Sequence, residues 1–348
     1  MVMSANTSGN PFRSANPFRS GGRFARFGLP RREKMDKPVK VFMPVTGDGK
    51  QQRQIRALPG FLGSRQIVRD VSGLPGALGR IGNLEIRLAR TVGDIRRAQR
   101  LRYQVFYEEM AANPSAKCRL ARRDIDAYDR VCDHLLVIDH DYRRTPRSGV
   151  RPRVVGTYRV LRQELAERTG GFYSANEYDM RGLIDAHPGQ NILELGRSCV
   201  LKGYRNKRTV ELLWRGIWRY VSHHRVDLMI GCASLEGTDP AAVSLQLSFL
   251  HHFARAPEVW KIAALPERYI GMNRRPKTEI VPKAALGVLP PLIKGYLRLG
   301  ATFGDGAVVD RQFGTTDVFV VLRVKDIDKR YIDFYSDRPE TVAEANAA

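Results

Sequence analysis

The stretch NILELGRSCVLKGYRNKRTVELLW, residues 191–214, holds the pattern that decides the fold of this chain. Its first ten residues are mostly apolar, which is typical of a buried strand, and its last eight begin a helical pattern. Glu194 and Arg197 interrupt the strand, although a buried charge costs several kcal/mol unless it is paired. The strand therefore lies at an edge of its sheet, or this pair of charges performs chemistry.

Gly196 separates the two charged residues. In a regular strand, residues three positions apart point to opposite faces. A β-bulge at Gly196 would bring Glu194 and Arg197 to one side and would splay the strand from its neighbour. A splayed strand would offer backbone N–H groups to a ligand. The alternative is an ordinary salt bridge at a strand edge.

The strand is followed by a turn that is rich in glycine and cations, GYRNKRT, residues 203–209. A helix starts there, and the N–H groups at a helix N-terminus bind phosphate well. We therefore expect Arg205, Lys207 and Arg208 to form a phosphate site. Such a site would suit a transferase whose acyl donor is a phosphopantetheine thioester. The alternative is a solvated basic turn.

Further strands and helices can be predicted on both sides of this stretch. The expected strands are 84–90, 133–139, 153–161, 191–200, 226–235 and 317–324, and the expected helices are 91–110, 207–224, 238–253 and 289–300. Order is expected to begin near Leu84. Strands joined by a hairpin come first and strand–helix–strand units follow, so the fold class is α/β or α+β with a mixed sheet.

The first and third expected helices have recognisable start signals. Thr91 occupies an N-cap position and Asp94 follows three residues later, which favours a capping box. Pro240 suits a first-turn position in the helix over 238–253. Arg102 follows Ile95 by seven residues and so falls on the apolar face of the first helix. It needs a partner or a cavity there, or its stem must reach solvent.

More charges stand in apolar surroundings. Asp126 and Asp129 come just before a strand, and Arg159 lies inside another. These residues, together with Arg102, Glu194 and Arg197, would compensate one another if they gathered in one cleft. Such a cleft could bind a zwitterion such as an amino acid. Loop capping is the alternative for the two aspartates, and no spacing favours a metal site.

The N-terminal part of the chain has a different composition. It repeats Asn-Pro-Phe-Arg-Ser within residues 10–20 and is basic, and the 348-residue chain carries a net charge of +22. We expect residues 1–81 to be a disordered basic extension, 82–335 a catalytic domain and 336–348 a flexible tail. The charge indicates an anionic partner: nucleic acid, an anionic membrane or an acidic protein. The extension would suit an anionic membrane surface or single-stranded nucleic acid, and the alternative is a solvated extension without a specific role.

Other classes of protein are disfavoured by the sequence. The four cysteines lack the spacing of a zinc site or a disulfide scaffold, so reduced, buried thiols are expected. No apolar run is long enough to span a membrane, and the N-terminus has no apolar centre of a secretion signal. No Gly-x-Ser-x-Gly elbow supports a nucleophilic serine.

Several motifs together resemble a known family. RYQVF (102–106), DIDAYD (124–129), GTYRVL (156–161) and ELGRSCV (194–200) resemble the acyl-homoserine-lactone synthases, which are Gcn5-related N-acyltransferases. CDHLLV (132–137), GCASLEGTDP (231–240) and the segment 290–322 are more similar to the ornithine N-acyltransferases of ornithine-lipid synthesis. The resemblance covers Leu84 to Tyr335. A tryptophan usual in the lactone synthases is missing from YEEMAANP, which disfavours lactone synthesis.

The resemblance implies a reaction and its partners. The family joins a 3-hydroxyacyl group, donated by acyl carrier protein, to the α-amine of L-ornithine and forms lyso-ornithine lipid, without a resident cofactor or metal. The residues carried over by motif are Arg102, Phe106, Asp126, Asp129, Arg159, Glu194 and Arg197. A fold with a mixed central sheet flanked by helices is implied, as is a cytoplasmic enzyme held peripherally at the anionic inner-membrane surface.

A mechanism can be drawn on these residues as a hypothesis. Glu194 would accept the proton of the attacking amine, directly or through water. Backbone N–H groups at Gly196 to Cys199 would stabilise the oxyanion. Arg159 or Arg197 would bind the ornithine carboxylate, and Asp126 or Asp129 its side-chain ammonium. The alternatives are an acyltransferase for another amine, such as a lactone synthase, and a basic nucleic-acid-binding protein, although no nucleic-acid partner is expected.

Overall fold

The structure is a computed structural model and describes residues 73–143, 145 and 149–336. The strands in these residues are β1 (Gly79–Ile81), β2 (Leu84–Leu88), β3 (Asp133–Asp139), β4 (Arg153–Arg162), β5 (Ile192–Val200), β6 (Leu228–Glu236), β7 (Thr302–Asp310) and β8 (Thr315–Arg323). The α-helices are α1 (Val92–Tyr103), α2 (Ala116–Ala121), α3 (Gln163–Thr169), α4 (Met180–Asp185), α5 (Lys207–His223), α6 (Ser244–Phe253), α7 (Pro282–Val288), α8 (Pro291–Arg298) and α9 (Lys329–Ser336).

The strands form one sheet in the order β1-β2-β3-β4-β5-β6-β8-β7. Neighbouring strands are antiparallel except β5 and β6, which are parallel. A parallel pair needs a crossover connection, and α5 lies in the connection between these two strands. The expected mixed sheet flanked by helices is confirmed.

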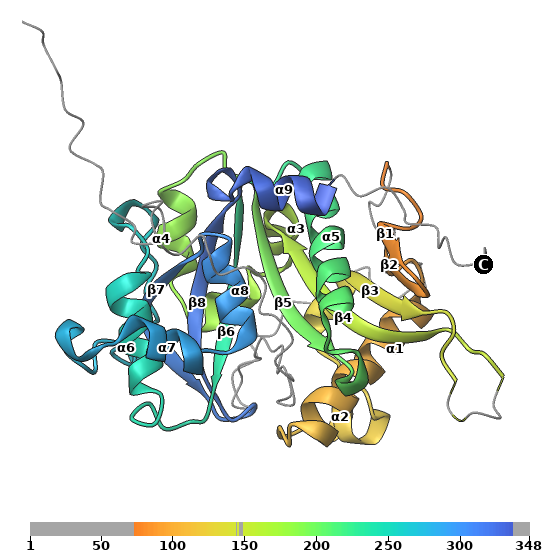
Figure 1. The fold of residues 1–348 in the computed structure, drawn as a ribbon, viewed down its shortest axis with the longest axis horizontal. Helices are drawn as coiled ribbons and strands as arrows, with labels where there is room; N and C mark the ends of the chain where they lie inside the picture. The colour runs from red at the N-terminus through yellow and green to blue at the C-terminus, as the bar shows by residue number, and fades with distance from the viewer. Residues whose placement is uncertain (1–72, 144, 146–148, 337–348) are drawn as a thin grey trace, which may run out of the picture. The chain divides into compact units, whose positions relative to one another are not determined.

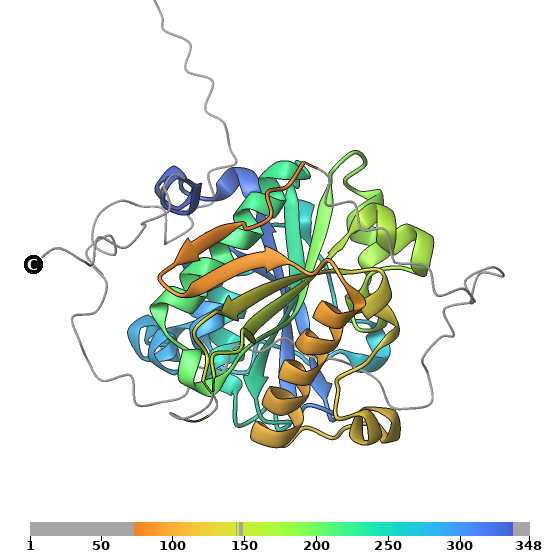
Figure 2. The same cartoon turned by 90° about the vertical axis from the view of Figure 1, so that its right-hand side faces the viewer.

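The two faces of the sheet carry different helices. On β3, Leu135 and Val137 belong to the same apolar cluster as Ile217 of α5, whereas Leu136 and Ile138 belong to the cluster that contains α1. Successive strand residues point to opposite faces, so α1 and α5 cover opposite faces of the sheet. Figures 1 and 2 show this arrangement.

The sheet divides between β5 and β6. Their ladder contains only the pairs Ile192–Leu228, Leu193–Met229 and Glu194–Ile230. Beyond it β5 continues only beside β4, and β6 continues beside β8 as far as Glu236. The two strands therefore separate after Glu194, as Figure 1 shows. This separation is the splay that the sequence predicts.

The first predicted helix is confirmed with one addition. Thr91 accepts from the backbone N–H of Asp94, and the Asp94 carboxylate accepts from the backbone N–H of Thr91, so the capping box is present. The regular helix ends at Tyr103, and residues Gln104–Glu109 continue it as a π-helical turn. Such turns are frequent at functional sites.

Two expectations about the fold are wrong, and one strand near the C-terminus is not predicted. Order begins before Leu84, because β1 pairs with β2. Pro240 does not start a helix: residues 240–243 form a turn and α6 begins at Ser244. The strand β7 is not predicted, because its glycines at 304 and 306 interrupt the strand pattern.

Residues 1–72 and 337–348 lie outside the described residues, and most of the predicted basic extension and C-terminal tail falls there. Within the described residues, every helix is too short or too polar to cross a bilayer.

Candidate active site

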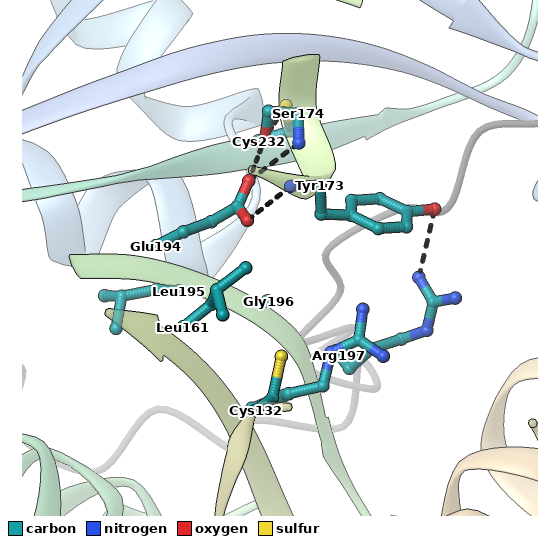
Figure 3. Close-up of a pocket in the computed structure, with 10 residues that line it drawn as sticks. Cys132, Leu161, Tyr173, Ser174, Glu194, Leu195, Gly196, Arg197 and Cys232 are labelled. Carbon is teal, nitrogen blue, oxygen red and sulfur yellow. Dashed lines mark hydrogen bonds between the residues drawn. The ribbon is translucent and has the colours of Figure 1, made fainter. Parts of the chain in front are cut away.

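A small cavity lies where β5 and β6 separate. It measures about 20 Å³, which is room for about one water molecule. The residues that line it come from β4, β5, β6, the position before β3 and the segment before α4, and they are Cys132, Arg159, Leu161, Tyr173, Ser174, Glu194, Leu195, Gly196, Arg197 and Cys232. Figure 3 shows Glu194 and Arg197 reaching the cavity from the same strand.

The bulge that the sequence predicts near Gly196 is confirmed. Thr157 of β4 pairs with Cys199 and Arg159 pairs with Gly196, so β5 holds one extra residue between these pairs. Arg197 takes up the irregularity with a φ of 51°, in the left-handed region that L-residues other than glycine rarely adopt. This strain at the cavity wall turns Arg197 to the side of Glu194.

An ion-pair network lies beside the cavity and contributes Arg159 and Arg197 to its lining. It contains three guanidinium groups and three carboxylates, from Arg102, Arg159, Arg197, Asp124, Asp126 and Asp129. Asp124 accepts from Arg102 Nε at 2.8 Å and from Arg197 Nε at 3.1 Å. Asp124 lies in the quoted DIDAYD motif, but the sequence analysis does not select it.

The aspartates that the sequence does select are held by arginine. Arg159 Nη1 donates to the two Asp126 oxygens at 2.7 and 2.6 Å, and Arg197 Nη2 donates to Asp126 at 2.8 Å. Burial alone would raise the pKa of Asp126, but the arginines hold it well below its usual range. Asp129 likewise accepts from Arg102 at 2.7 Å. Neither carboxylate is thus left over for a substrate ammonium, so that suggested role gains no support.

Two of the predicted residues lie behind the cavity. The Arg102 side chain is fully buried, and its described contacts are with Asp124 and Asp129. Phe106 is also fully buried and packs edge-on against Phe313, with ring centroids 5.6 Å apart. Neither residue lines the cavity. Arg102 belongs to the ion-pair network, and a direct substrate contact for either residue stays a prediction.

Glu194 lies on the opposite wall and makes no ion pair in the described part of the chain. Its Oε1 accepts from the Ser174 backbone N–H at 2.8 Å and from the Ser174 hydroxyl at 2.6 Å, and its Oε2 accepts from the Tyr173 N–H at 2.8 Å. Burial raises the pKa of Glu194 even though these hydrogen bonds oppose the rise. A carboxylate with a raised pKa is suited to accept a proton near neutral pH.

Tyr173 and Ser174 are site residues that the sequence analysis misses. They belong to a 3₁₀ turn, Tyr173–Asn176, after α3. The Tyr173 hydroxyl accepts from Arg197 Nη1 at 3.4 Å, so this residue contacts both walls of the cavity. No motif or periodicity in this segment signals that its backbone will meet β5.

The buried thiols at the cavity are poor nucleophiles. Cys132 and Cys232 line it, and burial raises the pKa of both thiols well above their usual range. A thiol, unlike a thiolate, is a weak nucleophile. All four cysteines are free and buried, as the sequence predicts.

The predicted phosphate residues lie at the start of α5 but in different settings. Arg205 Nη2 donates to Glu109 at 2.8 Å and Arg205 Nε donates to the Val200 carbonyl at 2.9 Å. Lys207 and Arg208 are exposed on the first turn. Asn206 caps this helix by accepting from the Thr209 N–H. The phosphate role of all three cations stays a prediction.

The chain matches a known domain family and characterised relatives. The family described as acetyltransferase (GNAT) domain matches residues 101–215, which include every site residue predicted from the sequence. An L-ornithine N(alpha)-acyltransferase of Agrobacterium fabrum is 53% identical over 267 residues, covering 77% of this chain and 90% of that one. Another, of Rhizobium meliloti, is 51% identical over 274 residues, covering 78% and 91%.

A more distant likeness is found among solved structures. A CoA-dependent acyl-homoserine lactone synthase shares 12% sequence identity and a TM-score of 0.40, over 74% of this chain and 100% of that one. The two relatives above share half of their residues with this chain along most of both lengths. The chain therefore belongs to the L-ornithine N(alpha)-acyltransferases.

Proposed function

We propose that this chain transfers an acyl group to the α-amine of L-ornithine. The acyl group would be a 3-hydroxyacyl chain, carried as a thioester on the phosphopantetheine of acyl carrier protein, and the product would be lyso-ornithine lipid. The observation that carries the proposal is the cavity at the splay, which has a carboxylate on one wall and two guanidinium groups on the other. An amino acid has the complementary charges.

The chemistry needs no acyl-enzyme. The neutral amine attacks the thioester carbonyl, a C–N bond forms and the C–S bond breaks, and the thiol leaves with a proton. Glu194 takes the proton that the ammonium must lose, directly or through the water that the cavity can hold. The bulge beside Gly196 supplies N–H groups for the oxyanion, since β5 has no ladder partner on this side beyond Glu194.

The acceptor is held by its carboxylate. Arg159 and Arg197 both line the cavity, and a guanidinium binds a carboxylate in a fixed, two-pronged geometry. Each already contacts Asp126, which keeps both guanidinium groups in place without closing the cavity.

The donor and the place of synthesis follow from charge. Acyl carrier proteins are acidic, and the exposed Lys207 and Arg208 beside the end of β5 would attract the phosphopantetheine phosphate. The net charge of +22 also suits peripheral contact with the anionic inner-membrane surface, on its cytoplasmic side, where a lipid product must leave.

One experiment tests the reaction. The purified chain is incubated with 3-hydroxyacyl carrier protein and a panel of amino acids, and the products are identified by mass and fragmentation. We expect Nα-acyl-ornithine as the main product. Acylation of the δ-amine, of another amino acid, or of nothing in the panel would contradict the proposal.

A further inference from the structure

Three more carboxylates lie beside the cavity and take no part in the mechanism above. Glu177 follows the 3₁₀ turn Tyr173–Asn176, Asp310 ends β7, and Asp317 lies on β8. At most 1% of each residue is exposed. We call these three residues the acid triad.

Strand register places the acid triad on the cavity side of β6. Cys232 lines the cavity, and Ser234 shares its face because strand residues two apart point the same way. Asp317 pairs directly with Ser234 across the ladder. Thr315, two residues before Asp317, pairs with Asp310. Side chains of directly paired residues lie on one face, so this face of β6, β8 and β7 carries the two aspartates.

Cys232 joins the acid triad to the cavity. Its Sγ lies 3.5 Å from the Ser174 hydroxyl, which lines the cavity and donates to Glu194. The same sulfur lies 3.5 Å from Glu177 Oε2. Two side chains, Ser174 and Cys232, therefore link Glu194, the carboxylate that we propose as the base, to Glu177 of the acid triad.

The acid triad has fewer partners than buried carboxylates normally have, although Asp310 Oδ1 accepts from the backbone N–H groups of Gln312 and Phe313. Among the described residues, Glu177 Oε1 and Asp310 Oδ2 have no hydrogen-bond partner. The fully buried Asp317 faces the neutral hydroxyls of Ser234 and Thr315, which lower its pKa but bring no positive charge. Buried polar groups are nearly always hydrogen-bonded, so unpartnered oxygens at one place indicate a missing donor.

Little positive charge reaches these oxygens. The one cation that the described residues bring within ion-pair distance is Arg268, whose Nη2 lies 3.7 Å from Glu177 and whose side chain is 27% exposed. Burial raises the pKa of Glu177 to about 8, with Arg268 opposing the rise and Asp310 adding to it. Burial also raises the pKa of Asp317, and Glu177 and Asp310 raise it further.

The missing hydrogen-bond donor has the properties of an ammonium group. No group of three or more His, Cys, Asp or Glu in the described residues could hold a metal ion. A primary ammonium carries one positive charge and three N–H donors, with no acceptor. It would satisfy several acceptor oxygens at once and supply the counter-charge that the acid triad lacks.

We propose that Glu177, Asp310 and Asp317 bind the side-chain ammonium of the amino-acid acceptor. This inference rests on the proposed function and adds the residues that select the acceptor. The acceptor then spans the splay: its carboxylate meets Arg159 and Arg197 at β4 and β5, and its side chain passes Cys232 toward β6, β8 and β7. The split sheet thus presents opposite charges to the two ends of one dipolar molecule.

The test compares L-ornithine with L-norvaline, which has the same side chain without the ammonium. In Asp317→Asn we expect kcat/KM for ornithine to fall about 10²-fold, the worth of hydrogen bonds to a charged group. The value for norvaline should change less than about threefold. Glu177→Gln should act in the same direction and serves if Asp317→Asn does not fold. The matched control is Asp133→Asn, another buried strand carboxylate, whose described partner is Tyr220 on the α5 face.

The outcomes separate the two proposals. An unchanged ornithine-to-norvaline ratio in both variants would overturn the ammonium site while leaving ornithine acylation intact. If the wild-type protein acylates neither amino acid, the proposed function fails. Ornithine and norvaline are then compared by the rise in melting temperature that each gives: a larger rise with ornithine, lost in Asp317→Asn, supports the site, and equal rises overturn it.

Discussion

Glu194 and Arg197 lie three positions apart on one strand, yet both line the same cavity. An extra residue between the Gly196 and Cys199 pairs makes this possible, because it shifts the strand's alternation by one position. The strand then offers a carboxylate and a guanidinium to one ligand. The same irregularity coincides with the end of pairing to β6, so the charges and the opening arise together.

Replacing Glu194 with Gln tests its role as the proton acceptor. We expect kcat to fall about 10²–10⁴-fold, the usual contribution of a positioned base. In the wild type, kcat should decline on the acid side at a pH above the ordinary glutamate range, because burial raises the pKa of Glu194 and the base must be ionised. The measurement is kcat with saturating substrates from pH 5 to 9.

The control for this variant is Glu211→Gln. Glu211 is also buried, but it lies on α5 and pairs with Arg215. Its replacement should leave kcat within about twofold of the wild type. If Glu194→Gln keeps full turnover and an unaltered pH profile, Glu194 is not the base.

Replacing Asp124 with Asn tests the network beneath the cavity. Asp124 is shared by Arg102 and Arg197, both nearly or fully buried, so its loss leaves two guanidinium groups short of a partner. We expect the free energy of unfolding to fall by about 3–5 kcal/mol. Denaturant titration measures it. Glu258→Gln, which removes an exposed pair with Lys261, should cost less than about 1 kcal/mol. Equal effects of the two changes would refute a structural role for the network.

Replacing Arg159 with Lys tests how the acceptor carboxylate is bound. Lysine keeps the charge but loses the planar, two-pronged donor. We expect KM for ornithine to rise about 10–100-fold, whereas ornithinamide, which has no carboxylate, should be affected less than about threefold. Initial rates with both acceptors provide the comparison. A similar loss with both would show that Arg159 holds the protein together without reading the carboxylate.

The double change of Lys207 and Arg208 to Ala tests the predicted phosphate site. These cations are exposed at the start of α5, so their loss should leave stability unchanged. We expect KM for the acyl carrier protein to rise about threefold to tenfold and to depend less on salt. KM for ornithine should stay constant. The matched control is Lys329 and Arg330 to Ala, an exposed pair that begins α9. An equal effect of the control would point to general charge attraction.

Stability should depend on pH through Glu177. Its pKa in the folded chain, about 8, lies above the unfolded value, so the folded state holds this proton more tightly. The contribution is fully present below the unfolded pKa and is lost as pH rises through about 8. We expect the free energy of unfolding to fall by roughly 2–5 kcal/mol between pH 5 and 9, and Glu177→Gln to flatten the curve. A wild-type curve as flat as that of the variant would contradict the raised pKa.

Ornithine should oppose this loss of stability. An ammonium favours the ionised form of Glu177, so the rise in melting temperature that ornithine gives should grow from pH 6 to 9. Norvaline controls for the α-amine and the carboxylate, which both amino acids carry. The charged groups that act on Glu177 besides the triad are Arg268 and Glu194. In Glu177→Gln, with Arg268 unchanged, the rise in melting temperature should depend on pH in the same way for ornithine and norvaline, because the ionisable carboxylate is gone.

Local patterns were enough for much of the fold. Apolar periodicity located β2 to β6 and α5, and the Thr91 capping box marked the start of α1. The local sequence pattern also identifies β5 as the strand of the site, since Glu194 and Arg197 are charges in an apolar run with a glycine between them. These features depend on neighbours within a few residues, which is the range over which sequence patterns act.

Other parts of the site depend on pairing between distant segments. The Tyr173 and Ser174 amides reach Glu194 only because the turn after α3 packs on β5. The acid triad forms because β8 inserts between β6 and β7, so that Asp317 and Asp310 share a face. Nothing near Asp317 in the sequence distinguishes it from a strand residue at a solvated edge.

The sequence by itself thus determined the strands, the bulge and the charged residues of one wall. Only the tertiary structure decided which charges neutralise one another and which remain unmatched. The physical reason is that charge compensation in a protein interior depends on distances of a few ångströms between atoms from separate elements. Asp126 and Asp129 carry the same carboxyl group as Asp317, but arginines surround the first two and none in the described residues pairs with the third.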